Sequence, residues 1–254
     1  MKLIRDQVQS GQRLFGTWCN LGASLTVEIA GLAGFDWVLI DMEHGAGDQS
    51  ELVHQLQAVD ATPAAGVVRI AANEPARFKR VLDLGASGIM VPYVNTPAEA
   101  EQAVRSMRYP PHGVRGVARL NRASGFGQSF EHYYTHASHE LLTIVQIETA
   151  EAVDRVDAIA AVEGVDVVFV GPLDLTTSLG VQGRYEDERF TAALDRVAAA
   201  ARSAGKASGI LLLSESALEP VIDRGYSFIA LGSDGGMVTT GMQQAAATVG
   251  RFRG

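Results

Sequence analysis

The sequence predicts a single-domain α/β protein of the (β/α)8, or TIM-barrel, class, and three observations support this. Eight short runs rich in β-branched and aliphatic residues occur along the 254 residues, and amphipathic helical patterns lie between most of them. The runs are continuously apolar, as expected of parallel strands that are buried on both faces. Eight such units in about 250 residues also match the size of this barrel.

The expected elements follow in order from these patterns. Strands are expected at residues 15–20, 37–43, 66–71, 88–94, 142–148, 165–171, 207–213 and 228–233. The clearest helical patterns cover residues 51–60, 75–85, 97–107, 150–162 and 190–205. Glycines stand where helices should end, at Gly34, Gly85, Gly164, Gly205 and Gly225. A doubly wound sheet is the alternative, but the segment NLGASLTVE after the first strand shows no Gly-rich phosphate fingerprint.

One segment interrupts the rhythm of strands and helices. Residues 108–140 lie between the fourth and fifth expected strands and are rich in Gly, Pro, His and Tyr. A long irregular insert in a compact domain is usually functional or mobile. Its tract of His132, Tyr133, Tyr134, His136 and His139 has no tight metal-ligand spacing, which favours a surface helix or loop. The whole chain, 1–254, is therefore expected to be one barrel with this insert.

Composition excludes several classes of protein. The formal net charge is -8 and the pI is near 5.2, whereas a nucleic-acid binder would carry a basic patch or stripe. The single cysteine, Cys19, excludes an intrachain disulfide and a multi-cysteine metal site. The first residues lack the apolar core of a secretory signal, and no apolar run is long enough to span a bilayer. We therefore expect a cytoplasmic protein that acts on a small molecule, not on nucleic acid or membrane.

Polar residues gather at the ends of several expected strands, where TIM barrels carry their active sites. They are Asp41, Glu43 and His44 after the second strand, Arg69 in the third, Gln146 and Glu148 in the fifth, Asp174 after the sixth, and Ser233 and Asp234 after the eighth. A purely structural design would not require this clustering.

Glu148 and Asp174 end adjacent strands, so two like charges would lie close together. One of the carboxyl groups would then have to keep its proton. A hard divalent cation removes the repulsion, because Mg²⁺ takes one or two carboxylates and keeps further positions for water or substrate oxygens. The alternative is that both carboxylates only cap the helices that follow them.

Two interpretations are open for His44, and two for Arg69. Asp41 precedes His44 by three residues and would orient its imidazole as a general base, or His44 is a solvated turn residue. Arg69 stands in an otherwise apolar strand, where an unpaired guanidinium is costly. It forms a structural pair with Glu43 or Asp41, or it binds a substrate carboxylate with its planar fork.

Five segments in order resemble one family, the class II pyruvate-dependent aldolases of the HpcH/HpaI type. They are GLAGFDWVLIDMEH, VLDLGASGIMVPYV, RYPPHGVRGV, TIVQIETAEAVD and EGVDVVFVGPLDLTTSLG, and the match runs from about residue 10 to 236. The family includes 4-hydroxy-2-oxoheptanedioate, 2-dehydro-3-deoxyglucarate and 2-keto-3-deoxy-L-rhamnonate aldolases. The resemblance implies a metal-dependent (β/α)8 barrel that cleaves a 4-hydroxy-2-oxo acid to pyruvate and an aldehyde.

The resemblance also implies roles for the metal and substrate ligands. Glu148 and Asp174 would bind Mg²⁺, Mn²⁺ or Co²⁺, and this cation would chelate the 2-oxo and carboxylate oxygens of pyruvate and hold its enolate. Gln146 and the backbone around Leu173, together with Asp174, would contact the pyruvate moiety. No lysine lies at any of these positions, which argues against a Schiff-base aldolase.

The catalytic residues implied by the resemblance are Arg69, His44, Asp41 and Asp83. Arg69 would stabilise the developing enolate oxygen. His44, with Asp41 as its partner, would move the proton of the 4-hydroxyl group through a bound water. The family usually has Asp-Gly-Glu-His-Ala-Pro where this chain has DMEHGA at 41–46, so the turn that aims His44 differs.

Asp83 is expected to end a helix at the bottom of its own barrel, so a role in catalysis would require a neighbouring subunit. The resemblance to this family implies a hexamer built as a dimer of trimers, in which a C-terminal helix packs on a neighbouring subunit. The tail MVTTGMQQAAATVGRF would serve in this way, or it would close its own barrel as an apolar helix.

The segments GLAGFDW, NEPARFKRVLD and NRASGFG favour a sugar-acid substrate such as 2-dehydro-3-deoxyglucarate. The insert 108–140 and the loop after the first strand are expected to form the aldehyde end of the pocket. Two alternatives remain: an oxaloacetate decarboxylase or related lyase on the same scaffold, and a barrel that binds an oxo acid without catalysis. The altered turn at 41–46 is the only support for the last of these.

Overall fold

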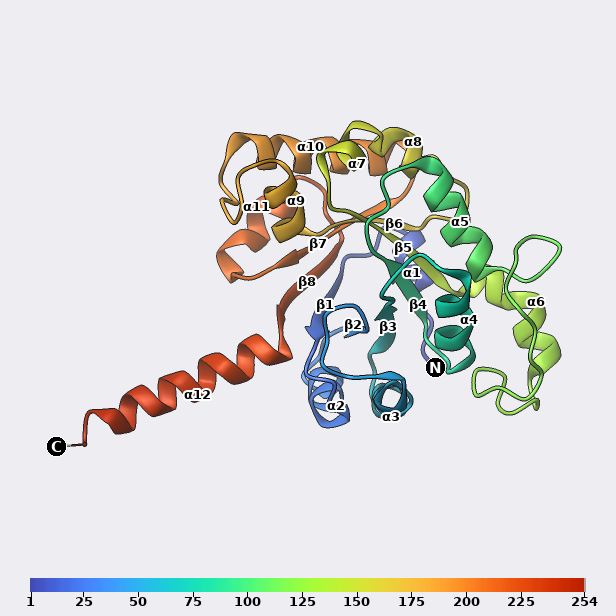
Figure 1. Cartoon of the computed structure of the whole chain (residues 1–254), viewed down its shortest axis with the longest axis horizontal. Helices are drawn as coiled ribbons and strands as arrows, with labels where there is room; N and C mark the ends of the chain where they lie inside the picture. Colours follow the sequence, from blue (N-terminus) through green and yellow to red (C-terminus); the bar gives the residue numbers. More distant parts are fainter. Residues whose placement is uncertain (254) are drawn as a thin grey trace.

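A computed structural model describes residues 1–253, in which eight parallel strands form a closed barrel inside a ring of helices (Figure 1). The strands are β1 (Leu14–Cys19), β2 (Trp37–Asp41), β3 (Ala65–Arg69), β4 (Gly88–Val91), β5 (Leu142–Ile147), β6 (Val167–Val170), β7 (Ala207–Leu212) and β8 (Phe228–Ser233). Each strand pairs with the next in sequence, and β8 pairs with β1. The predicted TIM barrel and all eight predicted strands are confirmed.

The helices include every predicted one, and all except α1, which precedes β1, follow a strand. They are α1 (Arg5–Gln9), α2 (Ser24–Leu32), α3 (Gln49–Asp60), α4 (Pro75–Asp83), α5 (Pro97–Met107), α6 (Phe130–Glu140), α7 (Ala150–Asp154), α8 (Val156–Ala160), α9 (Pro172–Ser178), α10 (Glu188–Ser203), α11 (Leu218–Asp223) and α12 (Asp234–Gly250). The segment 150–162, predicted as one helix, is divided into α7 and α8 at Arg155, where the backbone leaves helical geometry with φ -107° and ψ 9°.

Most strands end one to three residues earlier than their apolar runs predict, and for β2 and β4 the structure shows the cause. In β2 the side chain of Asp41 accepts the backbone N–H groups of Glu43 and His44, which turns the chain out of the strand direction. After β4 the chain reaches Tyr93, whose φ is +51°. This left-handed conformation is uncommon for a residue with a side chain, and it cannot continue a strand. Both deviations lie at the carboxyl ends of the strands.

The barrel interior is filled by alternate residues of the strands. Trp37 stacks on Phe228 with ring centroids 4.1 Å apart, and Leu39, Val67, Ile144 and Phe169 fill neighbouring positions. Because successive side chains of a strand point to opposite faces, the next inward positions belong to Asp41, Arg69 and Gln146. The interior is therefore an apolar core at one end and a polar layer at the carboxyl ends of the strands.

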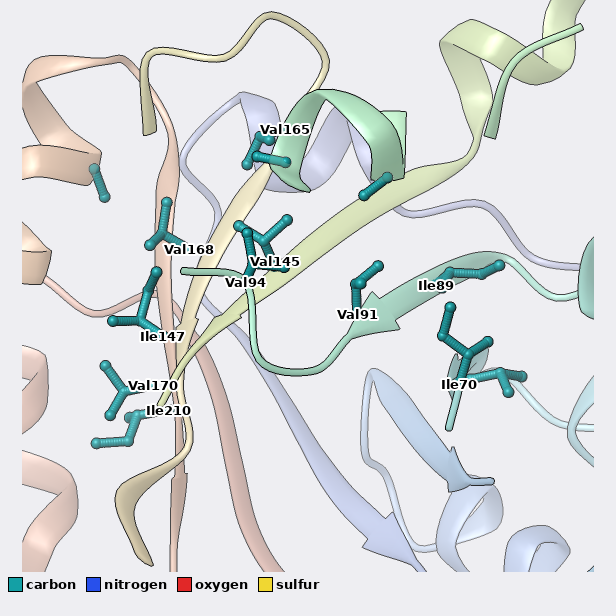
Figure 2. Close-up of a cluster of buried hydrophobic side chains, with 14 of the residues drawn as sticks. Ile70, Ile89, Val91, Val94, Val145, Ile147, Val165, Val168, Val170 and Ile210 are labelled. Carbon is teal, nitrogen blue, oxygen red and sulfur yellow. The ribbon is translucent and has the colours of Figure 1, made fainter. Parts of the chain in front are cut away.

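The outward-facing residues form a second apolar layer between the strands and the helices. Figure 2 shows Val145, Ile147, Val168, Val170 and Ile210 in this layer, all of them buried. Two apolar layers on the two faces of the strands explain why the sequence runs are continuously hydrophobic rather than alternating. They also hold the strand ends, and hence the polar layer, in fixed positions.

The insert 108–140 lies at the opposite end of the barrel from the polar layer. Its side chains bind the ends of α3 and α4: Arg115 pairs with Asp83 at 2.7 Å, and Arg122 donates to the carbonyl of Leu84 at 2.7 Å and pairs with Asp60. The helix α5 runs antiparallel to the strands and delivers the chain to this end. The expectation that the insert forms the aldehyde end of the pocket of its own barrel is therefore not met. Its histidine-rich part is the surface helix α6.

The C-terminal helix α12 leaves the barrel and extends away from it (Figure 1). It touches α2, β1 and β8 at its start, and Asp234 is its only buried residue. The tail therefore does not close its own barrel. Among residues 1–253, no helix combines the length and the apolar character needed to cross a membrane.

Candidate active site

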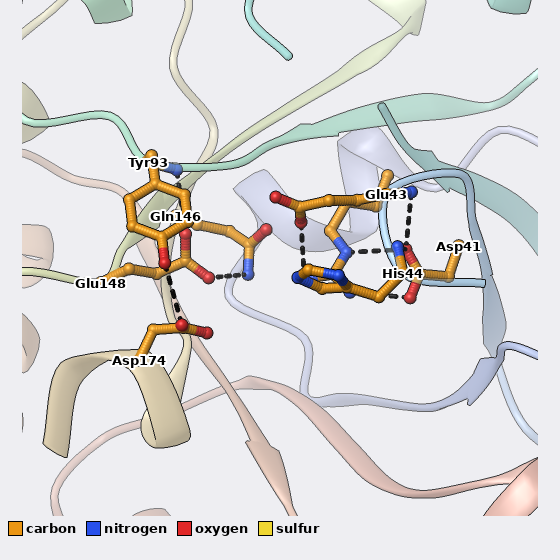
Figure 3. A network of polar contacts seen from close by, with 8 residues as sticks. Asp41, Glu43, His44, Tyr93, Gln146, Glu148 and Asp174 are labelled. Carbon is orange, nitrogen blue, oxygen red and sulfur yellow. Dashed lines mark hydrogen bonds and ion pairs between the residues drawn. The ribbon is translucent and has the colours of Figure 1, made fainter. Parts of the chain in front are cut away.

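The polar layer brings together side chains from five strand ends (Figure 3). Asp41 and Arg69 are the last residues of β2 and β3 and are direct partners in the strand register. Gln146 lies in β5, Glu148 follows that strand, and Asp174 lies in the first turn of α9 after β6. In Figure 3, Tyr93, Gln146, Glu148 and Asp174 form one side of the site, and Asp41, Glu43 and His44 form the other.

Arg69 is held by two carboxylates. Its Nε donates to Oδ1 of Asp41 at 2.9 Å and its Nη2 to Oδ2 at 2.7 Å, while Nη1 lies 2.9 Å from Oε2 of Glu43. Burial lowers the pKa of the guanidinium, but Asp41 and Glu43 outweigh it and the net shift is upward, so Arg69 is charged. A guanidinium has five N–H groups, and three are used, so two remain for a substrate oxygen. Of the two predicted roles of Arg69, the ion pair with Asp41 and Glu43 is therefore present. The two remaining N–H groups leave room for the other role, the binding of a substrate carboxylate.

His44 lies in the turn after β2. Its backbone N–H donates to Oδ1 of Asp41 at 3.3 Å, but no hydrogen bond joins its imidazole ring to Asp41 in the described part of the chain. Asp41 instead uses both oxygens on Arg69. Burial raises the pKa of the nearby Glu43 carboxyl, against the lowering effect of Arg69 and His44. Asp41 thus positions His44 through the backbone of the turn and not through its ring.

Glu148 is the most buried carboxylate of the site, with only 1% of its surface exposed. The backbone N–H of Tyr93 donates to Oε2 at 2.9 Å, and Nε2 of Gln146 donates to Oε1 at 2.9 Å. Burial raises the pKa of Glu148 to about 7, and the charge of Asp174 contributes in the same direction. Gly171 makes room for this carboxyl, because a Cβ at that position would overlap Oε1.

Asp174 faces Glu148 from the start of α9. The hydroxyl of Tyr93 donates to its Oδ1 at 2.9 Å, and this hydrogen bond, with burial, raises the pKa of the tyrosine to about 12. Leu173 precedes Asp174 with its side chain half exposed, and its backbone N–H belongs to the first turn of α9, where helical N–H groups have no partner within the helix. These first-turn groups are available to a bound anion.

The residues present fit a hard divalent cation. Two carboxylates from different elements offer four oxygens, and N–H or O–H donors contact three of them. The Oε1 of Gln146 is buried in the same place without a hydrogen-bond partner. In residues 1–253 no three His, Cys, Asp or Glu side chains are grouped as a metal site, so the protein offers two carboxylates, a number that suits Mg²⁺ with substrate oxygens completing its shell.

Comparison with known proteins decides the family. The profile of the HpcH/HpaI aldolase/citrate lyase family matches residues 14–240. The chain belongs to this family. It is 43% identical over 244 residues to a pyruvate aldolase of Rhizobium etli, with 96% of each chain covered. It is 42% identical to a 5-keto-4-deoxy-D-glucarate aldolase of Klebsiella pneumoniae, covering 96% of this chain and 93% of that one.

A solved structure supports the same assignment. An HpcH/HpaI aldolase/citrate lyase family protein from Burkholderia cenocepacia superposes with a TM-score of 0.92 and 38% identity, over 97% of this chain and 98% of the other. The resemblance seen in the five sequence segments is confirmed, and the chain is an aldolase-type member of the HpcH/HpaI family by its relatives.

Two residues named in the sequence analysis, Asp83 and Asp234, lie outside the cluster of polar side chains at the strand ends of this HpcH/HpaI protein. Asp83 ends α4 below β4 and accepts from Arg115 and from Asn121, so it does not meet the other predicted residues within its own chain. Asp234 accepts from the backbone of Asn20 at 2.8 Å and from the hydroxyl of Thr26 at 2.6 Å. Asp234 therefore fastens the loop after β1 to the end of β8.

Sequence reasoning missed Tyr93, which contacts both Glu148 and Asp174. The residue stands in the segment VPYV after a predicted strand, so its position at a strand end was the available signal. The buried thiol of Cys19 lies at the end of β1, and burial raises its pKa far above the ordinary range. A protonated, buried thiol is a poor nucleophile. We therefore assign Cys19 no role as a nucleophile in this HpcH/HpaI site.

Proposed function

We propose that this protein is a class II aldolase, which uses Mg²⁺, Mn²⁺ or Co²⁺ to cleave a 4-hydroxy-2-oxo acid to pyruvate and an aldehyde. The observation that carries the proposal is the buried Glu148 carboxyl, whose pKa is raised to about 7, beside Asp174 and opposite the charged Arg69. The buried carboxylate of Glu148 and the partly exposed carboxylate of Asp174 repel each other, and a cation is the partner that removes this cost and binds an oxo acid.

The names of two relatives support a proposal for the substrate class. The Klebsiella protein is named for a keto-deoxy sugar diacid, and the Rhizobium protein for pyruvate. We propose that the substrate here is of the same kind, a sugar-acid derivative such as 2-dehydro-3-deoxyglucarate. The negative overall charge of the protein does not oppose this, because Arg69 and the first turn of α9 supply local donors for an anion.

The roles of the residues follow from their geometry. A cation held by Glu148 and Asp174 would supply Lewis-acid polarisation of the 2-oxo group. Arg69 donates its two remaining N–H groups to the oxygen on which negative charge develops, and Asp41 and Glu43 hold it in place for this. Gln146 steadies Glu148 through Nε2, and the first-turn N–H groups near Leu173 bind the substrate carboxylate.

The proton of the 4-hydroxyl group requires a base, and His44 is the neutral-pH candidate at this end of the barrel. The turn held by Asp41 places His44 on the same side of the site as Asp41 and Glu43 (Figure 3), the two carboxylates that hold Arg69. Cleavage of the C3–C4 bond then gives the aldehyde and the pyruvate enolate, which takes a proton at C3 to become pyruvate. A bound water between the 4-hydroxyl and His44 would carry the proton.

The proposal predicts enolisation of pyruvate without any aldehyde. Purified protein with Mg²⁺ is expected to exchange the methyl protons of pyruvate with D₂O, followed by proton NMR, because the site stabilises the enolate by itself. The control is the same sample with EDTA, in which exchange should fall to the rate without protein. Absence of exchange with Mg²⁺, Mn²⁺ and Co²⁺ alike would contradict a metal-dependent pyruvate aldolase.

We also propose that the chain works as a homo-oligomer, the hexamer of two trimers that the sequence resemblance implies. The helix α12 projects from the barrel with Met237, Met242 and Val249 at least half exposed. It starts beside α2, whose Leu25 and Ile29 are 70% and 66% exposed. Exposed apolar side chains on two adjoining helices mark a protein interface, and a second copy of the chain is the partner that offers the same side chains.

Removal of residues 237–254 is expected to reduce the size of this assembly, because it deletes the exposed apolar part of α12. Light scattering coupled to size exclusion, on the full chain and the shortened one at the same concentration, gives both masses. The matched control is a chain with Gln243 and Gln244 changed to alanine, which alters the helix without removing its apolar residues. A monomeric full-length protein would contradict the proposal.

A further inference from the structure

Tyr93 contacts both carboxylates of the site with two different groups. Its backbone N–H donates to Oε2 of Glu148, and its hydroxyl donates to Oδ1 of Asp174, each at 2.9 Å (Figure 3). Glu148 follows β5 and Asp174 lies in α9, so the two carboxylates come from separate elements. No other described residue is hydrogen-bonded to both of them.

The backbone of Tyr93 is fixed in an unfavourable conformation. Its φ of +51° lies in the left-handed region, which residues with a Cβ rarely adopt. Contacts on its C-terminal side hold it there: the N–H of Val94 donates to the carbonyl of Gln146 at 3.2 Å, and the side chain of Asn95 binds the hydroxyl of Thr149. This conformation aims the N–H of Tyr93 at Glu148. Strained residues that the surroundings hold in place cluster at functional sites.

The ring of Tyr93 is not held by burial. The residue is 47% exposed, so the hydrogen bond to Asp174 is the specific contact that fixes the phenol. Asp174 in turn receives no other side-chain donor among the described residues. The hydroxyl of Tyr93 therefore determines which way the Asp174 carboxylate points, while the backbone of the same residue holds Glu148.

We propose that Tyr93 is a positioning residue that sets the spacing and orientation of Glu148 and Asp174 for the divalent cation. The inference rests on the proposed function, since it assigns these two carboxylates to a cation. Residues that hydrogen-bond to metal ligands orient them and contribute to metal affinity without touching the metal. The Oδ2 of Asp174 and the remaining lone pairs of Glu148 stay available to the cation.

The test is the affinity for Mn²⁺ measured by electron paramagnetic resonance of the free ion, with no substrate present. Tyr93→Phe keeps the ring and the N–H and removes only the hydroxyl, and it is expected to weaken Mn²⁺ binding by about tenfold. Tyr134→Phe is the matched control, because it removes a tyrosine hydroxyl whose only hydrogen bond within residues 1–253 is to the carbonyl of Pro110. The control should stay within about twofold of the unaltered protein, since it touches no metal ligand.

The outcomes separate this inference from the proposed function. If the unaltered protein does not bind Mn²⁺, the proposed function fails and the inference fails with it. If the unaltered protein binds Mn²⁺ and Tyr93→Phe binds it equally well or more tightly, only the role of Tyr93 is wrong. Tyr93→Leu provides a second arm: the same loss as for Tyr93→Phe assigns the effect to the hydroxyl, whereas loss in the leucine variant alone assigns it to ring packing and overturns the inference.

Discussion

Glu148→Gln is expected to abolish metal binding and metal-dependent turnover. The variant loses one of two carboxylates, and changes to residues that only support a ligand already cost about 10–100-fold in affinity, so a loss of more than about a hundredfold is expected. The fold should persist, because burial raises the pKa of Glu148 from 4.5 to about 7, and a neutral amide avoids the cost of that buried charge. Mn²⁺ titration and turnover with Mg²⁺ measure the two effects.

The matched control is Glu151→Gln, which removes a carboxylate three residues later from an exposed pair with Arg155. It should bind Mn²⁺ as the unaltered protein does. A Glu148→Gln protein that keeps metal-dependent turnover would show that the cation lies elsewhere.

The same carboxyl predicts the direction of the pH dependence. The pKa of Glu148 is raised in the folded protein, so its contribution to the stability of the metal-free protein is complete below the unfolded pKa near 4.5 and is lost as the pH rises through about 7. A cation must displace the proton, so Mn²⁺ affinity should rise about tenfold per pH unit below 7 and level off above it. The pH-dependent rise should be absent from Glu148→Gln.

Arg69→Met is expected to lower both turnover and stability. Loss of a donor to a developing oxyanion costs about 100- to 1000-fold in turnover. The variant also leaves Asp41 buried and Glu43 mostly buried without their counter-charge, and removal of one partner of a buried pair costs about 3–5 kcal/mol. Turnover with saturating Mg²⁺ and the free energy of unfolding in urea measure the two losses.

A double variant separates the structural role of Arg69 from the catalytic one. Arg69→Met combined with Asp41→Asn removes the more deeply buried of the two unpaired charges and leaves that of Glu43, so part of the stability should return. Turnover should stay low, because no donor faces the reacting oxygen. Recovery of turnover together with stability would assign Arg69 a structural role alone.

The fold could be predicted because its signal is repeated along the chain. Each strand carries apolar residues on both faces, as Val145 and Ile147 do on the outside and Ile144 on the inside of β5, so the run stays hydrophobic to its end. A polar residue in such a run is then conspicuous. Asp41, Arg69, Gln146 and Glu148 were all found in this way, and the structure places them in one layer.

The features that the sequence does not predict depend on contacts between segments far apart in the chain, and a local sequence pattern does not reveal such contacts. Tyr93 adopts a left-handed backbone although nothing in VPYV favours it, because the conformation is imposed by the neighbouring strand end. The side-chain partner of Asp41 is Arg69 and not His44, since the register of β2 and β3 brings the guanidinium opposite it. The insert 108–140 was assigned to the wrong end of its own barrel because its composition indicates irregular structure but not the direction in which α5 delivers the chain.

The two sides of the site are attached to the barrel in different ways. Asp41 and Arg69 are ladder residues of β2 and β3, so the sheet itself fixes the half that carries the guanidinium. Tyr93, Glu148 and Asp174 lie just beyond their strands, in connections whose length and sequence barrels tolerate changing. A change in the length of one of these connections would therefore move a proposed metal ligand, whereas the half that carries Arg69 keeps its geometry for as long as the sheet itself is kept.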